Sequence, residues 1–244
     1  MAPKAKDVAI RLVILNLLYD HGTIFVDEPT AKEAERLHSE ILELLDKYDL
    51  WNLLTASEHE IFKCNPLELS DEYATDIFYS INSRGVLAWC LGLLEGMPGF
   101  DTSLFDDESI LDDFYETKPS PVDIATIKWK LRSAKEIDHA RDVAEMWHWR
   151  SRTLSLQRSK PIAKSDKKSE LYRKIVSDVA SSSLPDLGVL TLDDDFSAFG
   201  KPYLMLDDEE WDKIHLITLY RHRALNWVCG YAPSDNYDET PTDT

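Results

Sequence analysis

The sequence of 244 residues predicts a mainly α fold: a single-domain, helical bundle-like globule with a small two-stranded β-ribbon near residues 188–206. Three observations lead to this prediction. Apolar side chains recur at helical spacing through most of the chain, several Ser or Thr residues are followed three positions later by Glu, and strand-like patterning is confined to one short stretch. No internal repeat or clear boundary divides the chain, so we expect residues 1–244 to form one domain.

The N-terminal run "VAIRLVILNLLYD" is apolar but is interrupted by Arg11 and Asn16, and no small-residue cleavage site follows it. We therefore expect neither a signal peptide nor a membrane span there. Thr30 and Glu33 have the spacing of a capping box, which predicts that an amphipathic helix begins at this point and runs to about residue 51.

Ser57 and Glu60 predict the start of a short helix that ends before Asn65-Pro66, because the residue before a proline disfavours helical backbone. The apolar spacing over residues 71–95 predicts one long buried helix with a bend near Gly85. The acidic residues 106–113 then read as a solvated loop.

Ser133 and Glu136 predict the start of a helix that continues to about residue 157. The polar, basic stretch at about 159–169 reads as a flexible connector, and a helix over about 170–180 follows. "GVLTL" and "PYLML" are the two expected strands of the ribbon, and Asp207 is expected to cap the last helix.

The formal net charge is −18, from 45 acidic and 27 basic side chains. Such a surface repels nucleic-acid phosphates and anionic membranes and favours a basic protein partner. The chain has three cysteines without a CxxC pair, which suits free thiols in a reducing cytoplasm. Because phosphate-loop, dinucleotide-binding and metalloprotease motifs are absent from the sequence, we expect no cofactor and no metal.

The last helix carries polar side chains on an otherwise apolar surface. His215, Leu219, His222, Asn226 and Cys229 share one strip of it. A buried polar group without a partner costs about 1–3 kcal/mol, so His222 and Asn226 must find hydrogen bonds. They could anchor neighbouring loops, line a functional pocket, or bind zinc together with other ligands.

A second polar stripe lies in "DVAEMWHWRSR". Asp142, Glu145, His148 with Trp149, and Arg152 follow one another at steps of three or four residues. A histidine near a carboxylate can act in acid–base chemistry, and a neighbouring arginine can hold an anion. The alternative is a ladder of salt bridges within the helix.

Several blocks of the sequence resemble one bacterial family, the domain of unknown function 4272. They are "SRGVLAWCLGLLEGMP", "LRSAKEIDHARDVAEMWHWRSRTLSL", "GKPYLMLDDEEWDKI", "RHRALNWV" and "YDETPTDT". The similarity runs from about residue 30 to the C-terminus. The resemblance itself implies no activity.

The resemblance implies a set of shared polar and aromatic positions. These are Arg84, Arg132, Asp142, His148, Trp149, Arg152, Arg221, His222, Asn226, Trp227, Asp238 and Asp243. The chain departs from the family pattern at Ser83 and Tyr237, where the family has Trp, at Met146, where it has Arg, and at Tyr220, where it has Glu.

Three functions remain open from the sequence, one of them a metal-dependent protein that uses His215, His222 and acidic residues. The first is an interaction module that binds a partner, as immunity and antitoxin proteins do. The alternative is an enzyme with an acid–base site around Asp142, His148, Arg152, His222 and Asn226. We also expect the acidic tail to fold back, with Asp238 or Asp243 paired to an Arg or His of the core such as Arg152, Arg221 or His222.

Overall fold

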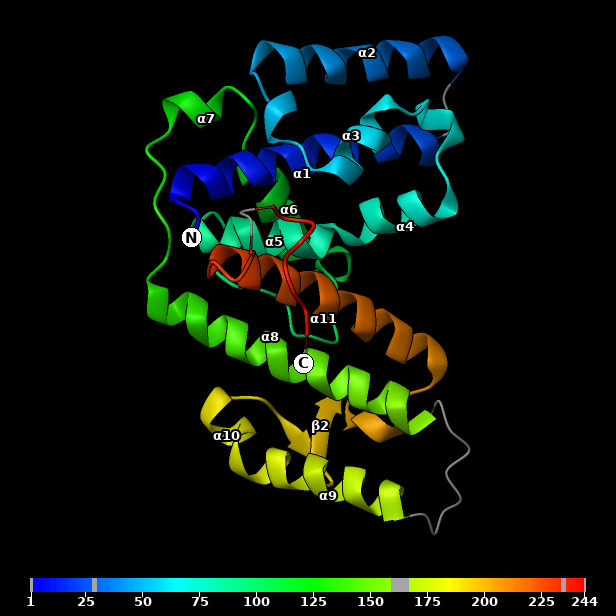
Figure 1. The fold of residues 1–244 in the computed structure, drawn as a ribbon, viewed down its shortest axis with the longest axis vertical. Helices are drawn as coiled ribbons and strands as arrows, with labels where there is room; N and C mark the ends of the chain where they lie inside the picture. The colour runs from blue at the N-terminus through cyan, green and yellow to red at the C-terminus, as the bar shows by residue number, and fades with distance from the viewer. Residues whose placement is uncertain (1, 28–29, 159–166, 234–235, 244) are drawn as a thin grey trace.

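The computed structural model describes residues 2–27, 30–158, 167–233 and 236–243, and it is mainly α. Figure 1 shows the helices stacked in layers, from α1 and α2 at one end to α9 and α10 at the other. The helices and strands are α1 (Ala5–Val26), α2 (Ala31–Lys47), α3 (Ala56–Lys63), α4 (Asp71–Tyr79), α5 (Ile81–Cys90), α6 (Glu108–Thr117), α7 (Asp123–Thr126), α8 (Ala134–Arg158), α9 (Lys167–Ser182), α10 (Leu184–Leu187), β1 (Thr191–Leu192), β2 (Asp195–Ala198), β3 (Lys201–Pro202) and α11 (Asp208–Val228).

Two hydrophobic clusters hold these elements together. The larger one joins α1, α5 and the second half of α11. The smaller one lies between α8, α9 and the strands, where Trp147 contacts Phe196 and Tyr203. The helices α8 and α11 pack against each other between the clusters (Figure 1). Polar side chains on their facing surfaces therefore meet inside the protein.

Helix α1 is long and apolar enough to cross a membrane by length and composition. In the folded protein, however, 72% of its most apolar window is buried. Val8, Leu12 and Leu15 pack in the larger cluster, as expected of a core helix. Arg11 interrupts the apolar run because it has a buried partner, Glu58 of α3.

The capping predictions are confirmed at three helix starts and wrong at one. Thr30 accepts from the Glu33 amide, and Ser133 and Asp207 each form a reciprocal pair with the glutamate three residues on. At α3 the cap is Thr55 with Glu58, not Ser57 with Glu60. Both pairs have the same spacing, but only Glu58 also reaches Arg11, which fixes the choice.

The prediction of one long helix over residues 71–95, bent near Gly85, is wrong. The segment forms two helices, α4 and α5, which meet at Ser80. The Ser80 hydroxyl donates to the carbonyl of Ile77, which stabilises the break. The predicted acidic loop is also wrong. Asp107 caps α6 by accepting from the Ile110 amide, and buried Phe114 holds that helix on the core.

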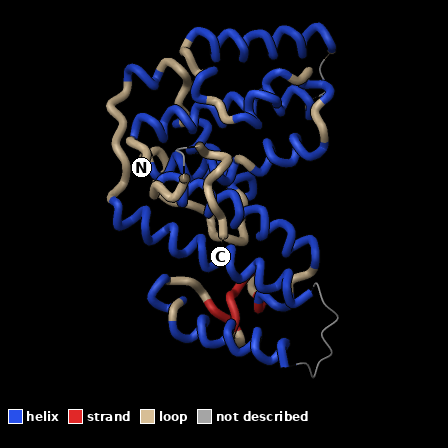
Figure 2. The backbone as a smooth tube through the Cα atoms, viewed as in Figure 1, coloured by secondary structure: helices blue, strands red, loops and turns tan. Residues whose placement is uncertain are grey.

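The predicted two-stranded ribbon is a three-stranded antiparallel sheet in the order β1-β2-β3. Figure 2 shows the strands only beside α9. The central strand β2 falls in the predicted connection, and "PYLML" forms a 3-10 turn over Tyr203–Met205. The sequence did not predict β2 because the strand begins with Asp195, the last residue of an acidic run. Asp195 is buried in the strand because it pairs with a buried arginine. Residues 159–166 of the predicted connector lie outside the described residues, and 167–169 begin α9.

Candidate functional site

Two histidines meet where α8 packs against α11. The Nδ1 atoms of His148 and His222 are 3.0 Å apart, and both side chains are buried. Each lies on the inward face of its helix, His148 beside Trp147 and His222 beside Arg221. Burial lowers the pKa of His148 to about 3 and that of His222 to about 4, with positively charged neighbours adding to the effect. Both rings are therefore neutral near pH 7.

The hydrogen bonds around these rings define which nitrogen carries the proton. Asn226 Nδ2 donates to the Pro241 carbonyl at 2.8 Å and to His222 Nε2 at 2.9 Å. Since His222 Nε2 accepts, its proton sits on Nδ1 and is donated to His148 Nδ1. The proton of neutral His148 is thus on Nε2. The chain tail, Asn226 and His222 together orient His148.

An open groove of about 400 Å³ adjoins His148 between α8 and α11. The described residues that line it are His148, Arg152, Ser155, Leu156, Trp211, His215, Leu219 and Thr242. His215 stacks on Trp211 with ring centroids 5.2 Å apart, and its Nδ1 lies 3.0 Å from the Ser151 hydroxyl. Burial lowers the pKa of His215 as well.

The α8 stripe divides between two faces of the helix. Arg152 lines the groove with His148, but Asp142 does not reach it. Asp142 pairs with Arg141 at 2.5 Å, and Arg141 also pairs with Glu145 at 2.9 Å. Six residues separate Asp142 from His148, which turns them about 120° apart around the helix. The predicted acid–base pairing of these two residues is wrong, and the salt-bridge ladder describes Asp142.

Trp149 also lies away from the groove, tilted against Phe196 in the smaller cluster. Within the described part of the chain, no three His, Cys, Asp or Glu side chains gather where they could hold a metal ion. His215 and His222 therefore have no acidic third ligand among these residues.

Arg221 holds a loop in place. Its Nη1 donates to the carbonyls of Pro98 and Gly99, and its Nη2 donates to that of Thr102, at 2.7–3.1 Å. The guanidinium also lies over the Phe100 ring, 5.1 Å from its centroid. Burial lowers the pKa of Arg221 to about 10.

Arg84 occupies an aromatic pocket in the larger cluster. Its Nε donates to Asn16 Oδ1 at 2.9 Å, and its guanidinium lies 4.2 Å from the Tyr19 ring centroid and 4.9 Å from that of Phe114. Burial lowers its pKa to about 10. Asn16 thus accepts from Nε of Arg84 and donates to the Pro119 carbonyl. Nη1 and Nη2 of Arg84 are buried without a hydrogen-bond partner among the described residues.

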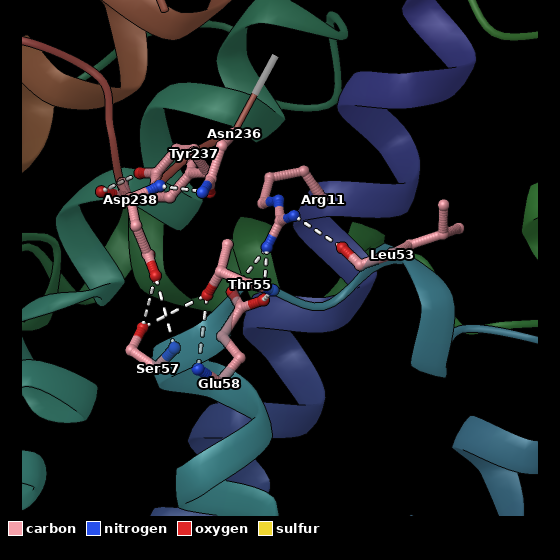
Figure 3. A network of polar contacts seen from close by, with 9 residues as sticks. Arg11, Leu53, Thr55, Ser57, Glu58, Asn236, Tyr237 and Asp238 are labelled. Carbon is pink, nitrogen blue, oxygen red and sulfur yellow. Dashed lines mark hydrogen bonds and ion pairs between the residues drawn. The ribbon is translucent and has the colours of Figure 1, made fainter. Parts of the chain in front are cut away.

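The acidic tail folds back onto the core, but not through the predicted pairs. Asp238 accepts from the Ser57 hydroxyl at 2.8 Å and from the Ser57 amide at 3.4 Å, at the N-terminus of α3 (Figure 3). A carboxylate is favourable there because the free amides and the helix dipole attract negative charge. Asp243 is exposed and forms no ion pair with a described residue. The prediction that one of them pairs with Arg152, Arg221 or His222 is wrong.

Tyr237 supplies the buried anchor of the tail. It packs edge-on against Trp227, and its hydroxyl donates to Ser83 Oγ at 2.9 Å. Ser83 in turn donates to the carbonyl of Tyr220 at 3.0 Å. Three of the four departures from the family pattern, Ser83, Tyr220 and Tyr237, therefore lie in contact with one another.

Two buried ion pairs were missed by the sequence analysis. Arg11 Nη1 lies 2.5 Å from Glu58 Oε1, with its Nη2 donating to the Leu53 carbonyl (Figure 3). Arg150 donates from Nε and Nη2 to the two oxygens of Asp195, at 2.6 and 2.7 Å. A charged residue on the apolar face of a predicted helix was the available signal for both arginines.

A second groove, of about 450 Å³, lies between α1 and α2. Its apolar lining residues are Leu17, Ile24, Leu37, Ile41 and Leu44, with Thr23 beside them. Three carboxylates also line it, those of Asp20, Asp27 and Glu40. No basic side chain appears among its described lining residues.

The comparisons agree with the resemblance in the sequence. A family model described as Domain of unknown function (DUF4272) matches residues 1–175. The matched residues include Arg84, His148 and Arg152 but not α11 or the tail. The sequence resemblance was expected to reach the C-terminus, so the family model matches a segment that ends earlier. No curated protein and no solved structure matches the chain. The model covers well over half of the sequence, and the chain therefore belongs to the DUF4272 family.

Proposed function

We propose that the chain is an interaction module that binds a basic, amphipathic segment of a partner protein in the groove between α1 and α2. The observation that carries the proposal is the lining of that groove, five apolar side chains together with three carboxylates. A helix that places Leu or Ile on one face and Lys or Arg beside it matches this lining in both shape and charge.

The carboxylates of the groove are available to a partner. Asp20 lies 3.8 Å from Lys118 Nζ, and Glu40 pairs with Arg36, but these pairs are at or near the surface. Exposed ion pairs contribute only about 0–1 kcal/mol, so a partner's cations can replace them at little cost. Asp27 is exposed at the end of α1 and pairs with no described basic side chain.

The charge of the whole chain supports the same partner. With a formal net charge of −18, the protein attracts cationic surfaces over the range of a Debye length. Complementary charge raises association rates and disfavours acidic competitors. Immunity- and antitoxin-like proteins work by this kind of binding, and they form the class to which we assign the chain.

The test uses two synthetic helical peptides of equal length, one patterned with Leu and Lys and the other with Leu and Glu. We expect the Lys peptide to bind, and the Glu peptide to bind at least about tenfold more weakly, which corresponds to about 1.4 kcal/mol. Asp27→Lys combined with Glu40→Lys should weaken binding of the Lys peptide. Glu35→Lys combined with Glu43→Lys, an equal change of charge at two exposed residues of α2 outside the groove lining, is the matched control. Equal binding of both peptides, or equal effects of the groove and control variants, would contradict the proposal.

An enzyme is the second candidate, supported by the groove beside His148. That groove contains Arg152, and His222 and Asn226 stand behind it, but Asp142 is excluded. A histidine with a pKa near 3 is a weak general base at neutral pH. The geometry therefore supports the interaction module better than acid–base catalysis.

A further inference from the structure

We propose that the groove between α8 and α11 is a binding site for a small ligand that carries a carboxylate or phosphate group. This site is separate from the α1–α2 groove and does not depend on the function proposed above. Three features of the groove lead to it: an arginine with no ion pair to a described residue, an oriented histidine donor and an apolar wall.

The arginine is Arg152. Three other arginines of α8 each have carboxylate partners: Arg141 pairs with Asp142 and Glu145, Arg150 with Asp195, and Arg158 with Asp208. Arg152 is exposed, lines the groove, and forms no ion pair with a described residue. Guanidinium groups hold carboxylates and phosphates through paired N–H donors.

The histidine donor comes from the hydrogen-bond chain behind the groove. Because Asn226 and His222 leave the proton of His148 on Nε2, this ring is fixed as a donor on a residue that lines the groove. The hydroxyls of Ser155 and Thr242 add two further donors to the lining. No described carboxylate lines the groove to compete for them.

The apolar wall is the stack of Trp211 on His215, with an interplanar angle of 16°. Leu156 and Leu219 lie on the same lining. This surface suits a ligand with a flat or apolar body beside its anionic group. Two acidic residues adjoin the groove: Asp212, which acts on His215, and Asp243, which follows Thr242. They set a limit on how much negative charge the site accepts.

The experiment titrates the full chain with benzoate, phenyl phosphate and benzyl alcohol, and follows binding by calorimetry. We expect saturable binding of at least one anionic probe, and at least about tenfold weaker binding of the neutral alcohol, because the alcohol cannot form charge-assisted hydrogen bonds with the guanidinium. Whichever anion binds tighter identifies carboxylate or phosphate as the preferred group, and either result supports the site.

The variants locate the binding. Arg152→Gln removes an exposed charge and should lower the affinity for the anionic probe about tenfold. Lys135→Gln, the same loss of charge at an exposed position near the start of α8, is the matched control and should bind as the original chain does. The proposal is overturned if no anionic probe binds saturably, if the alcohol binds as tightly, or if Arg152→Gln and Lys135→Gln behave alike.

Discussion

Arg150 and Asp195 form the ion pair that joins the β-sheet to α8. The guanidinium donates two bonds to the carboxylate, and Asp195 also accepts from the amides of Phe196 and Leu204. Both side chains are buried, so either one alone would leave an uncompensated charge inside the protein. The pair explains why an aspartate from an acidic run lies in the central strand.

Asp195→Ala should therefore be strongly destabilising. Breaking a buried pair by removing one partner costs about 3–5 kcal/mol, and the denaturant midpoint should fall accordingly. The matched control is Asp208→Ala, which breaks the pair with Arg158 at a side chain that is 93% exposed. Its midpoint should stay close to that of the original chain. Equal midpoints for the two variants would show that the Arg150 pair is not structural.

The buried histidines should make the protein less stable in mild acid. Burial lowers the pKa of His21 to about 4, of His148 to about 3 and of His222 to about 4, whereas an unfolded histidine titrates near 6.5. Between these values the unfolded chain binds protons that the folded chain does not. The free energy of unfolding should thus fall as the pH drops from about 6.5 towards 4, and be fully retained above 6.5.

His21→Leu tests this reasoning at one position. Both ring nitrogens of His21 are buried without a hydrogen-bond partner among the described residues, so Leu removes the titration without breaking a hydrogen bond seen there. Chemical denaturation at pH 7, 6 and 5 should show a shallower loss of stability in this variant. His139→Leu changes an exposed histidine of α8 and is the control. Identical slopes for both variants would contradict the assignment.

At the scale of elements, the tail after α11 behaves as part of the core. Tyr237 is buried against Trp227, Asn226 binds the Pro241 carbonyl, and Asp238 binds the start of α3. The tail also completes the hydrogen-bond chain that orients His148. It therefore links the larger cluster to the groove between α8 and α11.

Truncation after Ala232 should lower the melting temperature by several degrees. Burial of one aromatic side chain contributes about 1.5–3 kcal/mol, and 1 kcal/mol shifts the midpoint by about 2–4 °C in a chain of this size. Asp243→Asn, which changes an exposed charge of the same tail, serves as the control. If the truncated chain and the full chain have the same melting temperature, the tail does not stabilise the fold and the prediction is wrong.

The helix starts show how far local sequence predicts this fold. Capping spacing identified α2, α8 and α11, because each had one candidate cap next to an amphipathic run. At α3 two candidates overlapped, and the contact of Glu58 with Arg11, 47 residues away, decided between them. Such a long-range partner is not visible in local sequence.

The site residues divide in the same way. Helical periodicity correctly placed His222 and Asn226 on one strip, and the structure adds His148 and Arg152 from α8. Asp142 was grouped with these residues because each step along the stripe is only three or four residues. Those steps add up to a rotation around the helix, so Asp142 lies on another face and pairs with Arg141. The side of α8 that faces α11 is set by packing around Trp147, which the spacing alone does not give.

At the scale of the whole molecule, the two grooves have opposite character. The α1–α2 groove is lined by three carboxylates, whereas the α8–α11 groove is lined by Arg152, His148 and His215. The sequence shows a matching asymmetry, with 14 basic and 6 acidic residues between Lys128 and Lys174 in a chain that carries −18 overall. If both proposed sites bind their ligands, the two grooves select ligands of opposite charge.

The most direct test of the interaction function is to map the bound Lys peptide on the protein by backbone amide NMR. We predict that chemical-shift changes gather on α1 from Leu17 to Asp27 and on α2 from Leu37 to Leu44, the residues that line the groove. High salt should weaken binding of the peptide, because the groove carboxylates attract its lysines and salt screens that attraction. Shift changes centred on other acidic surfaces, such as α6, with α1 and α2 unaffected, would contradict the α1–α2 groove as the binding site.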